Sequence, residues 1–529
     1  MRIGDRTDLL FYGLVLLVVS LMYLLFYAEI PIYGDAWGYG YSSANWIAEN
    51  GLPFVPTGTG KGNTACGHFT VYFWLWAVLM RVAGDSVRVA HLLPAVFSFL
   101  AVAGTYRLSR DIGGKTMGVF AGIALLVSPL FLAQAFRPLP IAAVMAASIW
   151  SLFFYRREKY LTATLLCAFA VMMREQALML AVTYITAELF LFRQLSWRRI
   201  LLFAIPFLIL AIHGTLSFFV NRVNFHFYSA LSLKEPFSIS LLLYGVRHFG
   251  GFYLTDCFRW LPVAAGMGLL YSRLVNKRTG AGVGLLLCAL GASGISANYF
   301  IAVMLPLLLY PACFRRSSVS RTALVLGLFP AMLVMFLLLI LFITTSQFQF
   351  MFFRYMAAAF PALITGVMWA LFSCKKKCIP VTIAAVFVTA SALTNLTVRN
   401  EAFYSDTTLV GYYLPLQAMR NAGTWAEEQN LPVIALGLVV NHFSSPELGY
   451  TDSSLTVITV QDCLHFLEEQ NYTIVVPPVL PWGDDGEAIL RNFTEQLSDD
   501  YRLEFAQEFT GGPFSASCYY LYWEPKVSD

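Results

Sequence analysis

The sequence predicts a mainly α-helical polytopic membrane protein that carries a small α/β domain outside the membrane at its C-terminal end. Of the 529 residues, 58% are hydrophobic and 12% are charged, whereas charged residues make up about a quarter of a typical soluble protein. Long apolar runs alternate with short polar breaks as far as residue 394. Residues 395–529 instead hold short apolar runs and a strong excess of acid, with 19 Asp and Glu against 5 Lys and Arg.

The apolar runs predict about thirteen membrane-spanning helices, because one crossing needs roughly 20 residues. The first run ends at Glu29-Ile30-Pro31 without a small-residue cleavage site, so we expect it to remain as a span. The predicted spans are centred in 9–28, 89–106, 117–133, 138–155, 160–173, 176–192, 200–219, 252–272, 281–297, 299–313, 322–343, 355–373 and 379–394.

The basic residues predict the orientation. Residues 1–394 hold 30 Lys and Arg against 12 Asp and Glu, and 20 of the 35 basic residues fall in alternate connections. Basic residues near spans stay on the cytoplasmic side, so we expect a cytoplasmic N-terminus and an extracytoplasmic C-terminus, in a bacterial inner membrane. The predicted domains are a transmembrane domain, 1–394, with a first extracytoplasmic loop at 31–70, and a soluble α/β domain, 395–529.

Short buried strands are predicted in the soluble domain, separated by helix-like segments. The predicted strands are Val433–Leu438, Leu455–Val460, Tyr472–Val476, Tyr501–Phe509 and Cys518–Trp523, and the helical segments are Leu416–Gln429 and Cys463–Gln470. Cys463 and Cys518 share this domain and either form a disulfide in an oxidising compartment or stay as free thiols.

Asp35 is the first candidate for chemistry. It lies in the loop after the first span, where a carboxylate is either a solvated charge at a helix end or a general base. Trp37, Tyr39 and Tyr41 follow it and are typical of a lipid–water interface. The same loop holds Lys61 and His68, and His68 either donates to a phosphate when protonated or is only an interfacial polar residue.

Three arginines, Arg137, Arg174 and Arg354, fall in predicted extracytoplasmic turns. Each is either an interfacial cation reaching water or part of a clamp for an anionic lipid head group, because a guanidinium binds phosphate with two parallel hydrogen bonds. Glu175 either neutralises Arg174 or contacts a substrate. Glu188 is expected to pair with Arg193 as a structural contact.

Several function classes lack support in the sequence. The sequence has no basic run interleaved with stacking aromatics in a soluble segment, so it gives no indication of nucleic-acid binding. No glycine-rich nucleotide motif, zinc-protease motif or serine-nucleophile motif appears in a supporting context. A reaction is therefore expected on the outer face, with a donor that already lies in the membrane.

Residues 9–373 resemble the GT-C superfamily of polytopic glycosyltransferases, especially the protein O-mannosyltransferase, aminoarabinose-transferase and RgtA-like branch. The matching fragments occur in the family's order. They are Gly34-Asp35-Ala36, Ala44-Asn-Trp-Ile47, Glu49-Asn-Gly51, Gly67-His68, Tyr72-Phe-Trp-Leu75, Arg88 to Pro94, Ser128-Pro129 to Arg137, Met173-Arg174-Glu175 and Phe353-Arg354-Tyr355 with Phe360-Pro361.

The resemblance implies an inverting hexosyl- or pentosyltransferase that moves a sugar from a polyprenyl-phosphate donor to a lipid, glycan or protein acceptor on the extracytoplasmic face. In it, Asp35 is the general base. The implied phosphate-binding residues are Arg137, Arg174, Arg354 and His68, and the implied substrate-binding residues are Tyr355, Glu175 and Lys61. No cofactor is implied, and a divalent metal is not favoured because Ala36 stands where relatives often have a second acid.

Two other functions stay open. A transporter or flippase of lipid-linked or small substrates is predicted to carry ionisable residues near mid-span and helices broken at matching places in two repeats. A ligase or polymerase of cell-surface glycans differs from the first hypothesis mainly in its donor and acceptor.

Overall fold

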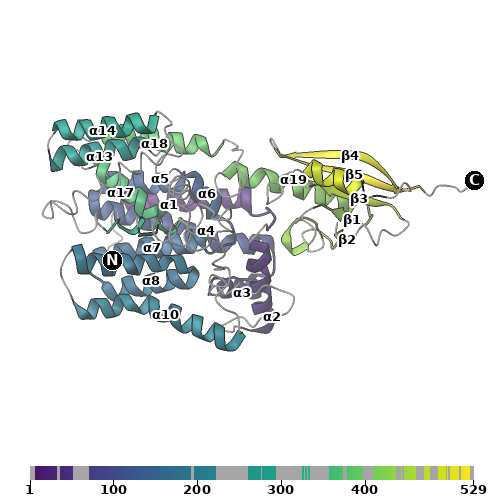
Figure 1. Ribbon diagram of the computed structural model, residues 1–529, viewed down its shortest axis with the longest axis horizontal. Coiled ribbons are helices and arrows are strands. Elements are labelled where there is room, and N and C mark those ends of the chain that lie inside the picture. Colours follow the sequence, from purple (N-terminus) through teal and green to yellow (C-terminus); the bar gives the residue numbers. More distant parts are fainter. Residues whose placement is uncertain are drawn as a thin grey trace, which may run out of the picture.

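The computed structural model describes a helical body and a smaller sheet domain, which follow one another along the long axis of the molecule with α19 between them (Figure 1). The described residues are 6–32, 36–51, 71–191, 196–221, 260–275, 277–292, 325–326, 328–330, 332–333, 357–372, 378–396, 409–436, 443, 446–459, 470–476, 486–495, 497, 501–511 and 514–524.

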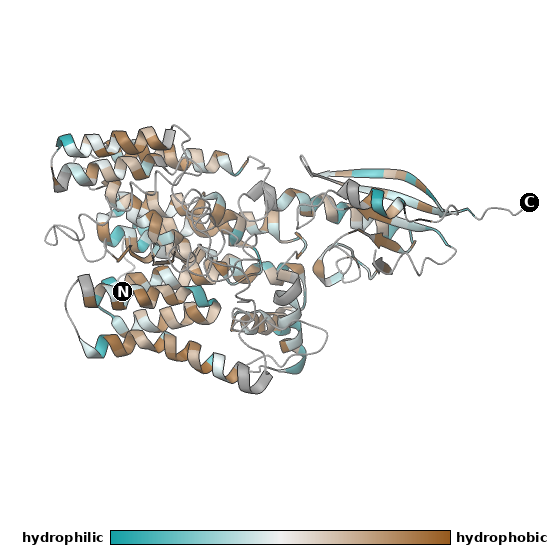
Figure 2. Cartoon of the chain, in the orientation of Figure 1, coloured by the Kyte–Doolittle hydropathy of each residue, from teal (hydrophilic) through white to brown (hydrophobic). Residues whose placement is uncertain are grey.

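The helices of the body are mostly apolar (Figure 2). They are α1 (Arg6–Met22), α2 (Ser42–Asn50), α3 (Val71–Ala83), α4 (Val87–Gly113), α5 (Lys115–Leu126), α6 (Pro129–Ala135), α7 (Ile141–Arg156), α8 (Tyr160–Met173), α9 (Leu178–Thr186), α10 (Trp197–Asn221), α13 (Trp260–Leu274), α14 (Lys277–Ala292), α17 (Phe360–Phe372) and α18 (Cys378–Thr394). Short turns of other helix types join some of them: η1 (Tyr23–Tyr27), η2 (Ala36–Tyr41), η4 (Glu175–Ala177) and η5 (Ala187–Leu191).

The number of membrane spans is lower than predicted in the part of the chain that is described. Three helical segments there are long and apolar enough to cross a membrane, or four if the bent pair α5–α6 counts as one. The predicted thirteen is therefore not confirmed. The α3 helix, Val71–Ala83, is a further difference, because no span was predicted between the first loop and residue 89.

The centre of the body is the packing of α4, α7 and α8. α7 and α8 form an antiparallel hairpin whose turn includes Glu158 with a φ of 58°. α4 approaches α7 closely at Gly104, where an added Cβ would lie 2.7 Å from the Ile149 side chain. This close packing explains why the helices bury their small and apolar residues so completely.

The helix formed by α5 and α6 bends by 63° between Leu126 and Pro129. Pro129 has no N–H group to donate into the preceding turn and disfavours helical backbone at Ser128, which has a ψ of 129°. The freed carbonyl of Val127 accepts a hydrogen bond from the Asn395 side chain, 2.7 Å away, just beyond α18. The buried Asn395 therefore satisfies a backbone group at the bend.

We expect Asn395→Ala to destabilise the helical body by about 1–3 kcal/mol, because it removes a donor from a buried carbonyl. The measurement is the apparent Tm in detergent. Thr382→Val is the matched control, since Thr382 lies exposed on the same helix and its hydroxyl bonds within that helix, to the Cys378 carbonyl. An equal loss of Tm in both variants would contradict the assignment of Asn395 to the bend.

The sheet of the C-terminal domain has the strand order β2-β1-β3-β5-β4. Its strands are β1 (Val433–Ala435), β2 (Val457–Thr459), β3 (Tyr472–Val476), β4 (Tyr501–Gly511) and β5 (Phe514–Trp523). β2, β1 and β3 pair in parallel, while β5 joins β3 and β4 antiparallel. Helix α19 (Leu409–Glu428) packs on β4 and β5, and α21 (Gly486–Thr494) packs on β3.

All five predicted strands occur, so the small α/β domain is confirmed. The segment 463–470, predicted to be helical, lies mostly outside the described residues, and so does Cys463. Cys518 is buried on β5 as a free thiol, and burial raises its pKa to about 12. The division at residue 394 stays a prediction, as does the orientation in the membrane, although α18 does end at Thr394.

Candidate functional site

The first loop is described only on either side of its acid. Asp35, Lys61 and His68 lie outside the described residues, and so do Arg354 and Tyr355. The two nearest described residues, Ile32 and Ala36, are fully buried, at 1% and 0% exposure. The predicted roles of these five polar residues stay predictions.

The C-terminal domain docks against the chain that leads into this loop. The Ile32 N–H donates to the carbonyl of Leu448, at 2.9 Å, in the turn η10 (Pro446–Leu448). Glu29 adds an ion-pair bridge between the two parts. Its carboxylate lies 2.8 Å from Arg88 of α4 and 3.3 Å from Arg420 of α19, and Arg420 also donates to the Glu29 carbonyl at 2.8 Å.

The two guanidinium groups hold the pKa of Glu29 below its ordinary value of 4.5, with the hydrogen bond from Arg88 as the largest cause. A carboxylate whose pKa is lowered by folding stabilises the folded state. This contribution is fully present when the pH is above the ordinary pKa, and it is lost as the pH falls through the lowered pKa. Because Glu29 is exposed, this contribution is small, about 0.2–1 kcal/mol for such pairs.

We expect Arg420→Ala to speed hydrogen exchange at the Ile32 amide, by up to about fivefold, because it releases one anchor of the docked domain. The same amide should exchange faster, relative to its intrinsic rate, as the pH falls below the lowered pKa of Glu29. Arg502→Ala is the control, since Arg502 pairs with Glu504 and Glu524 in the sheet domain. Equal rates in wild type and Arg420→Ala would show that the bridge does not hold the docked state.

Arg137 lies in the turn between α6 and α7 and is buried, at 2% exposure. Pro138 and Pro140 prevent α6 from continuing through this turn, because neither can donate a backbone hydrogen bond. Leu139 closes the turn by donating to the Arg137 carbonyl at 2.6 Å. Burying a guanidinium costs free energy unless it is paired or hydrogen-bonded, so this position is not an ordinary interfacial cation reaching water.

Arg174 is buried as well, at 5% exposure. It follows the last residue of α8, Met173, and has extended backbone with φ −159° and ψ 132°. Ala177, the last residue of the short turn η4, donates to the Arg174 carbonyl at 3.1 Å. Glu175, in the same turn, is only partly buried.

The hairpin of α7 and α8 brings both arginines to one end of the helical body. Arg137 precedes α7 by a few residues and Arg174 follows α8 directly, so the antiparallel pair returns the chain to the end from which it left. The contacts of His91, on the first turns of α4, place Glu29 to Ile32 at this same end. The structure thus places two of the three predicted arginines at the same end of the helical body as the approach to the first loop.

His91 is the residue that sequence reasoning missed. It is completely buried, with Nδ1 2.6 Å from the Phe136 carbonyl and Nε2 2.9 Å from the Ile30 carbonyl. Tyr27 supports the same junction: its ring stacks on Phe136 at 4.4 Å, and its hydroxyl donates to the Leu132 carbonyl at 3.2 Å. The available signal was the pair Pro138 and Pro140, which leaves nearby carbonyls without helical donors.

The opposite end of the helical body holds three carboxylates in ion pairs. Asp8 of α1 pairs with Arg107 and Arg110 of α4, and Asp111 pairs with Arg156 and Arg157 at the end of α7. Glu188 pairs with Arg199 at 3.1 Å and accepts from Tyr155 at 2.8 Å. The predicted partner of Glu188, Arg193, lies outside the described residues. These contacts join helices and provide no candidate site.

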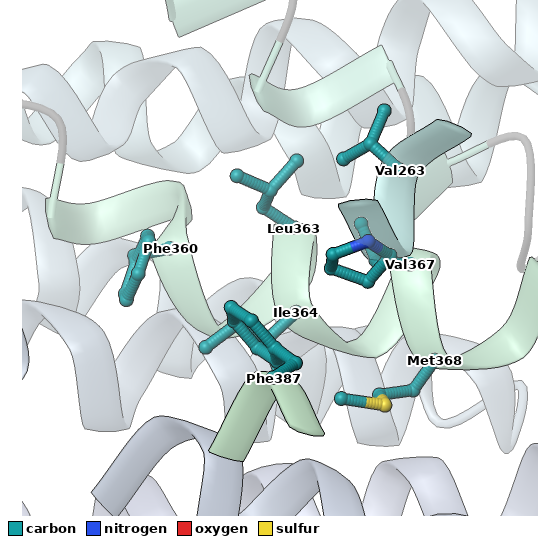
Figure 3. A pocket seen from close by; sticks show the side chains of 8 residues that line it. Val263, Phe360, Leu363, Ile364, Val367, Met368 and Phe387 are labelled. Atoms are coloured by element: carbon teal, nitrogen blue, oxygen red, sulfur yellow. The ribbon is translucent and has the colours of Figure 1, made fainter. Parts of the chain in front are cut away.

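An apolar cavity of about 20 Å³ lies between α13, α17 and α18 (Figure 3). Its lining includes Val263, Phe360, Ile364, Met368 and Phe387. The space has room for about one water molecule, and the described residues that line it are all apolar, so they offer no chemistry there. Among the described residues, no three His, Cys, Asp or Glu side chains cluster as metal ligands would.

Comparison with known proteins gives two findings. Residues 68–221 match the family model of dolichyl-phosphate-mannose-protein mannosyltransferases. The structure of ArnT from Cupriavidus metallidurans bound to undecaprenyl phosphate is similar to this one, with a TM-score of 0.52 and 14% identity over 98% of each chain. The resemblance to GT-C proteins is confirmed. No curated protein matches the sequence.

Two structures of the oligosaccharyltransferase of Archaeoglobus fulgidus are more distantly similar to this chain. The complex with Zn and sulfate has a TM-score of 0.44 and 13% identity, covering 93% of this chain and 67% of the other. The AglB complex with an inhibitory peptide and a dolichol-phosphate has a TM-score of 0.39 and 12% identity, covering 94% and 70%.

Proposed function

We propose that this chain is an integral-membrane glycosyltransferase that moves a sugar from a polyprenyl-phosphate donor to an acceptor at the extracytoplasmic face. One observation supports the proposal: Arg137 and Arg174 are both buried, and both lie at the end of the helical body from which the first loop leaves. The fold agrees, because it extends over 98% of an ArnT that was solved with undecaprenyl phosphate.

The leaving group explains the need for buried arginines. When the bond between the anomeric carbon and the phosphate oxygen breaks, negative charge develops on the polyprenyl phosphate. Guanidinium groups held away from water stabilise such charge strongly, because they are already oriented before the reaction. Arg137 and Arg174 supply this in our proposal, together with Arg354 and His68.

The acceptor side needs a base. A hydroxyl is a weak nucleophile, so we assign its deprotonation to Asp35. The acceptor oxygen then forms a bond to the anomeric carbon from the face opposite the phosphate, which inverts that carbon, and the proton passes to Asp35. Tyr355, Glu175 and Lys61 are assigned to contacts with the sugar or acceptor, and no metal is required in this scheme.

A transporter is the less favoured function. Within the described part of the helical body, the Asp, Glu, Lys and Arg residues lie in connections or in the first or last two turns of helices. A transporter is expected to place such groups near mid-span, on the path of its substrate. Their positions fit chemistry at one membrane face better than passage through the membrane.

We expect Asp35→Asn to abolish sugar transfer from polyprenyl-phosphate donors, by a factor of about 10² or more, because the amide cannot accept the acceptor's proton. Purified full-length protein would be assayed with radiolabelled lipid donors. Asp452→Asn removes an exposed carboxylate of the C-terminal domain and serves as the matched control. Transfer by Asp35→Asn at the rate of the control would refute the assignment of the base.

We expect Arg137→Lys to weaken binding of undecaprenyl phosphate by about ten- to a hundredfold, since a lysine keeps the charge but loses the paired hydrogen bonds. Binding would be measured by the quenching of intrinsic tryptophan fluorescence in nanodiscs. Arg502→Lys in the sheet domain controls for the substitution itself. An unchanged Kd for Arg137→Lys, with correct folding, would exclude Arg137 from the phosphate site.

A further inference from the structure

The C-terminal end of α6 receives side-chain donors from two positions of α4. Ser98 donates to the Ala135 carbonyl at 2.6 Å, and His91 contacts the next carbonyl, that of Phe136, at 2.6 Å. Both side chains are fully buried. They differ in one respect, because the second ring nitrogen of His91 contacts the Ile30 carbonyl at 2.9 Å.

We propose that His91 is a positioning residue for the transferase reaction: it links the approach to the first loop with the turn that carries Arg137. This inference rests on the proposed function. Its two partners are each close in sequence to a proposed functional group, since Ile30 precedes Asp35 by five residues and Phe136 is bonded to Arg137. A single rigid ring thereby sets the separation of the two segments.

Histidine suits this task because its two nitrogens lie at different edges of one planar ring. The neutral ring donates to one of the two carbonyls, and the protonated ring donates to both. The charged and titratable groups around the junction are Tyr27, whose ring is tilted against that of His91 with centroids 6.1 Å apart, the Glu29–Arg88 ion pair beside Ile30 and Arg137 after Phe136. The ring is held on two sides by segments that are far apart in the sequence.

Positioning matters for the proposed reaction because the base and the phosphate-binding arginine come from separate elements. A misplacement of about 1 Å can cost roughly a hundredfold in rate. α6 is a short helix after a 63° bend, so its end is not fixed by a long continuous helix. The link through His91 compensates for this.

Two variants separate the halves of the link. The amide nitrogen of Asn lies where Nδ1 of histidine does, and that of Gln lies near Nε2. His91→Asn should therefore keep the hydrogen bond to the Phe136 carbonyl and lose the contact with the Ile30 carbonyl. His91→Gln should keep the contact with Ile30 and lose the hydrogen bond to Phe136. Ser98→Ala is the matched control, because it also removes a bond between α4 and α6 but does not reach Ile30.

The first measurement is hydrogen exchange in the full-length protein without ligand, at the amides of Ile32 and Leu139. His91→Asn should speed exchange at the Ile32 amide by about tenfold, because it loses the buried contact with Ile30. His91→Gln should speed exchange at the Leu139 amide by about tenfold, because it loses the buried hydrogen bond to Phe136. Ser98→Ala should affect only Leu139. If His91→Asn and Ser98→Ala changed the exchange rates of the two amides in the same way, the proposal that His91 joins the two segments would be wrong.

The second measurement repeats the exchange with undecaprenyl phosphate in nanodiscs. In wild type and Ser98→Ala, the lipid should slow exchange at both amides by at least about threefold. In both His91 variants it should slow Leu139 alone, with a Kd for the lipid within about threefold of wild type, because neither variant removes an arginine side chain. Protection of Ile32 by the lipid in the His91 variants would overturn the positioning role.

The two failures are distinguishable. If wild-type protein does not bind undecaprenyl phosphate, the proposed donor class is wrong, and the ligand-free exchange still decides whether His91 joins the two segments. If the lipid binds and protects Ile32 regardless of His91, the proposed function stands and the positioning role is wrong.

Discussion

The structure depends on hydrogen bonds to the backbone carbonyls of residues 127–136. The chain leaves helical geometry there twice, before and after α6, inside the helical body. Water is scarce there, and an unpaired carbonyl costs as much as a lost hydrogen bond. Prolines at 129, 138 and 140 remove the donors that a continuous helix would supply. His91 takes the place of the donor that Pro140 lacks, because it bonds to Phe136 four residues earlier. Other side chains bond to nearby carbonyls of this stretch: Asn395 to Val127, Tyr27 to Leu132 and Ser98 to Ala135.

These contacts explain how one short segment assembles the candidate site. The donors come from η1, α4 and the end of α18, so the elements that carry them must converge on α6. Their convergence brings Glu29 to Ile32 next to the turn of Arg137. The irregular backbone is therefore not a defect of packing but the feature around which the predicted extracytoplasmic end is built.

Much of this could be predicted from the sequence, because it depends on local patterns. Short apolar runs located the five strands, and the polar break Phe136-Arg137-Pro138 located the turn of Arg137. The partners could not be predicted, because they depend on which distant side chains the packing brings together. Glu188 illustrates the limit: it pairs with Arg199 of the next helix, a partner that sequence spacing did not suggest, while the predicted pair with Arg193 stays a prediction. His91 offered no pattern of its own, since a lone histidine in an apolar run resembles any other buried polar residue.

The two ends of the helical body use charge differently. At the end away from the sheet domain, Asp8, Asp111 and Glu188 are mostly buried and each joins two helices through arginines of a neighbouring element. At the docked end, the carboxylate of Glu29 is exposed and links separate parts of the chain. A buried pair resists rearrangement, because breaking it leaves an uncompensated charge; an exposed pair can break and form again at little cost. The docked end therefore combines a tightly held interior, centred on His91, with a bridge whose two halves can separate. A reaction in which a bulky acceptor enters and leaves needs both properties at the same membrane face.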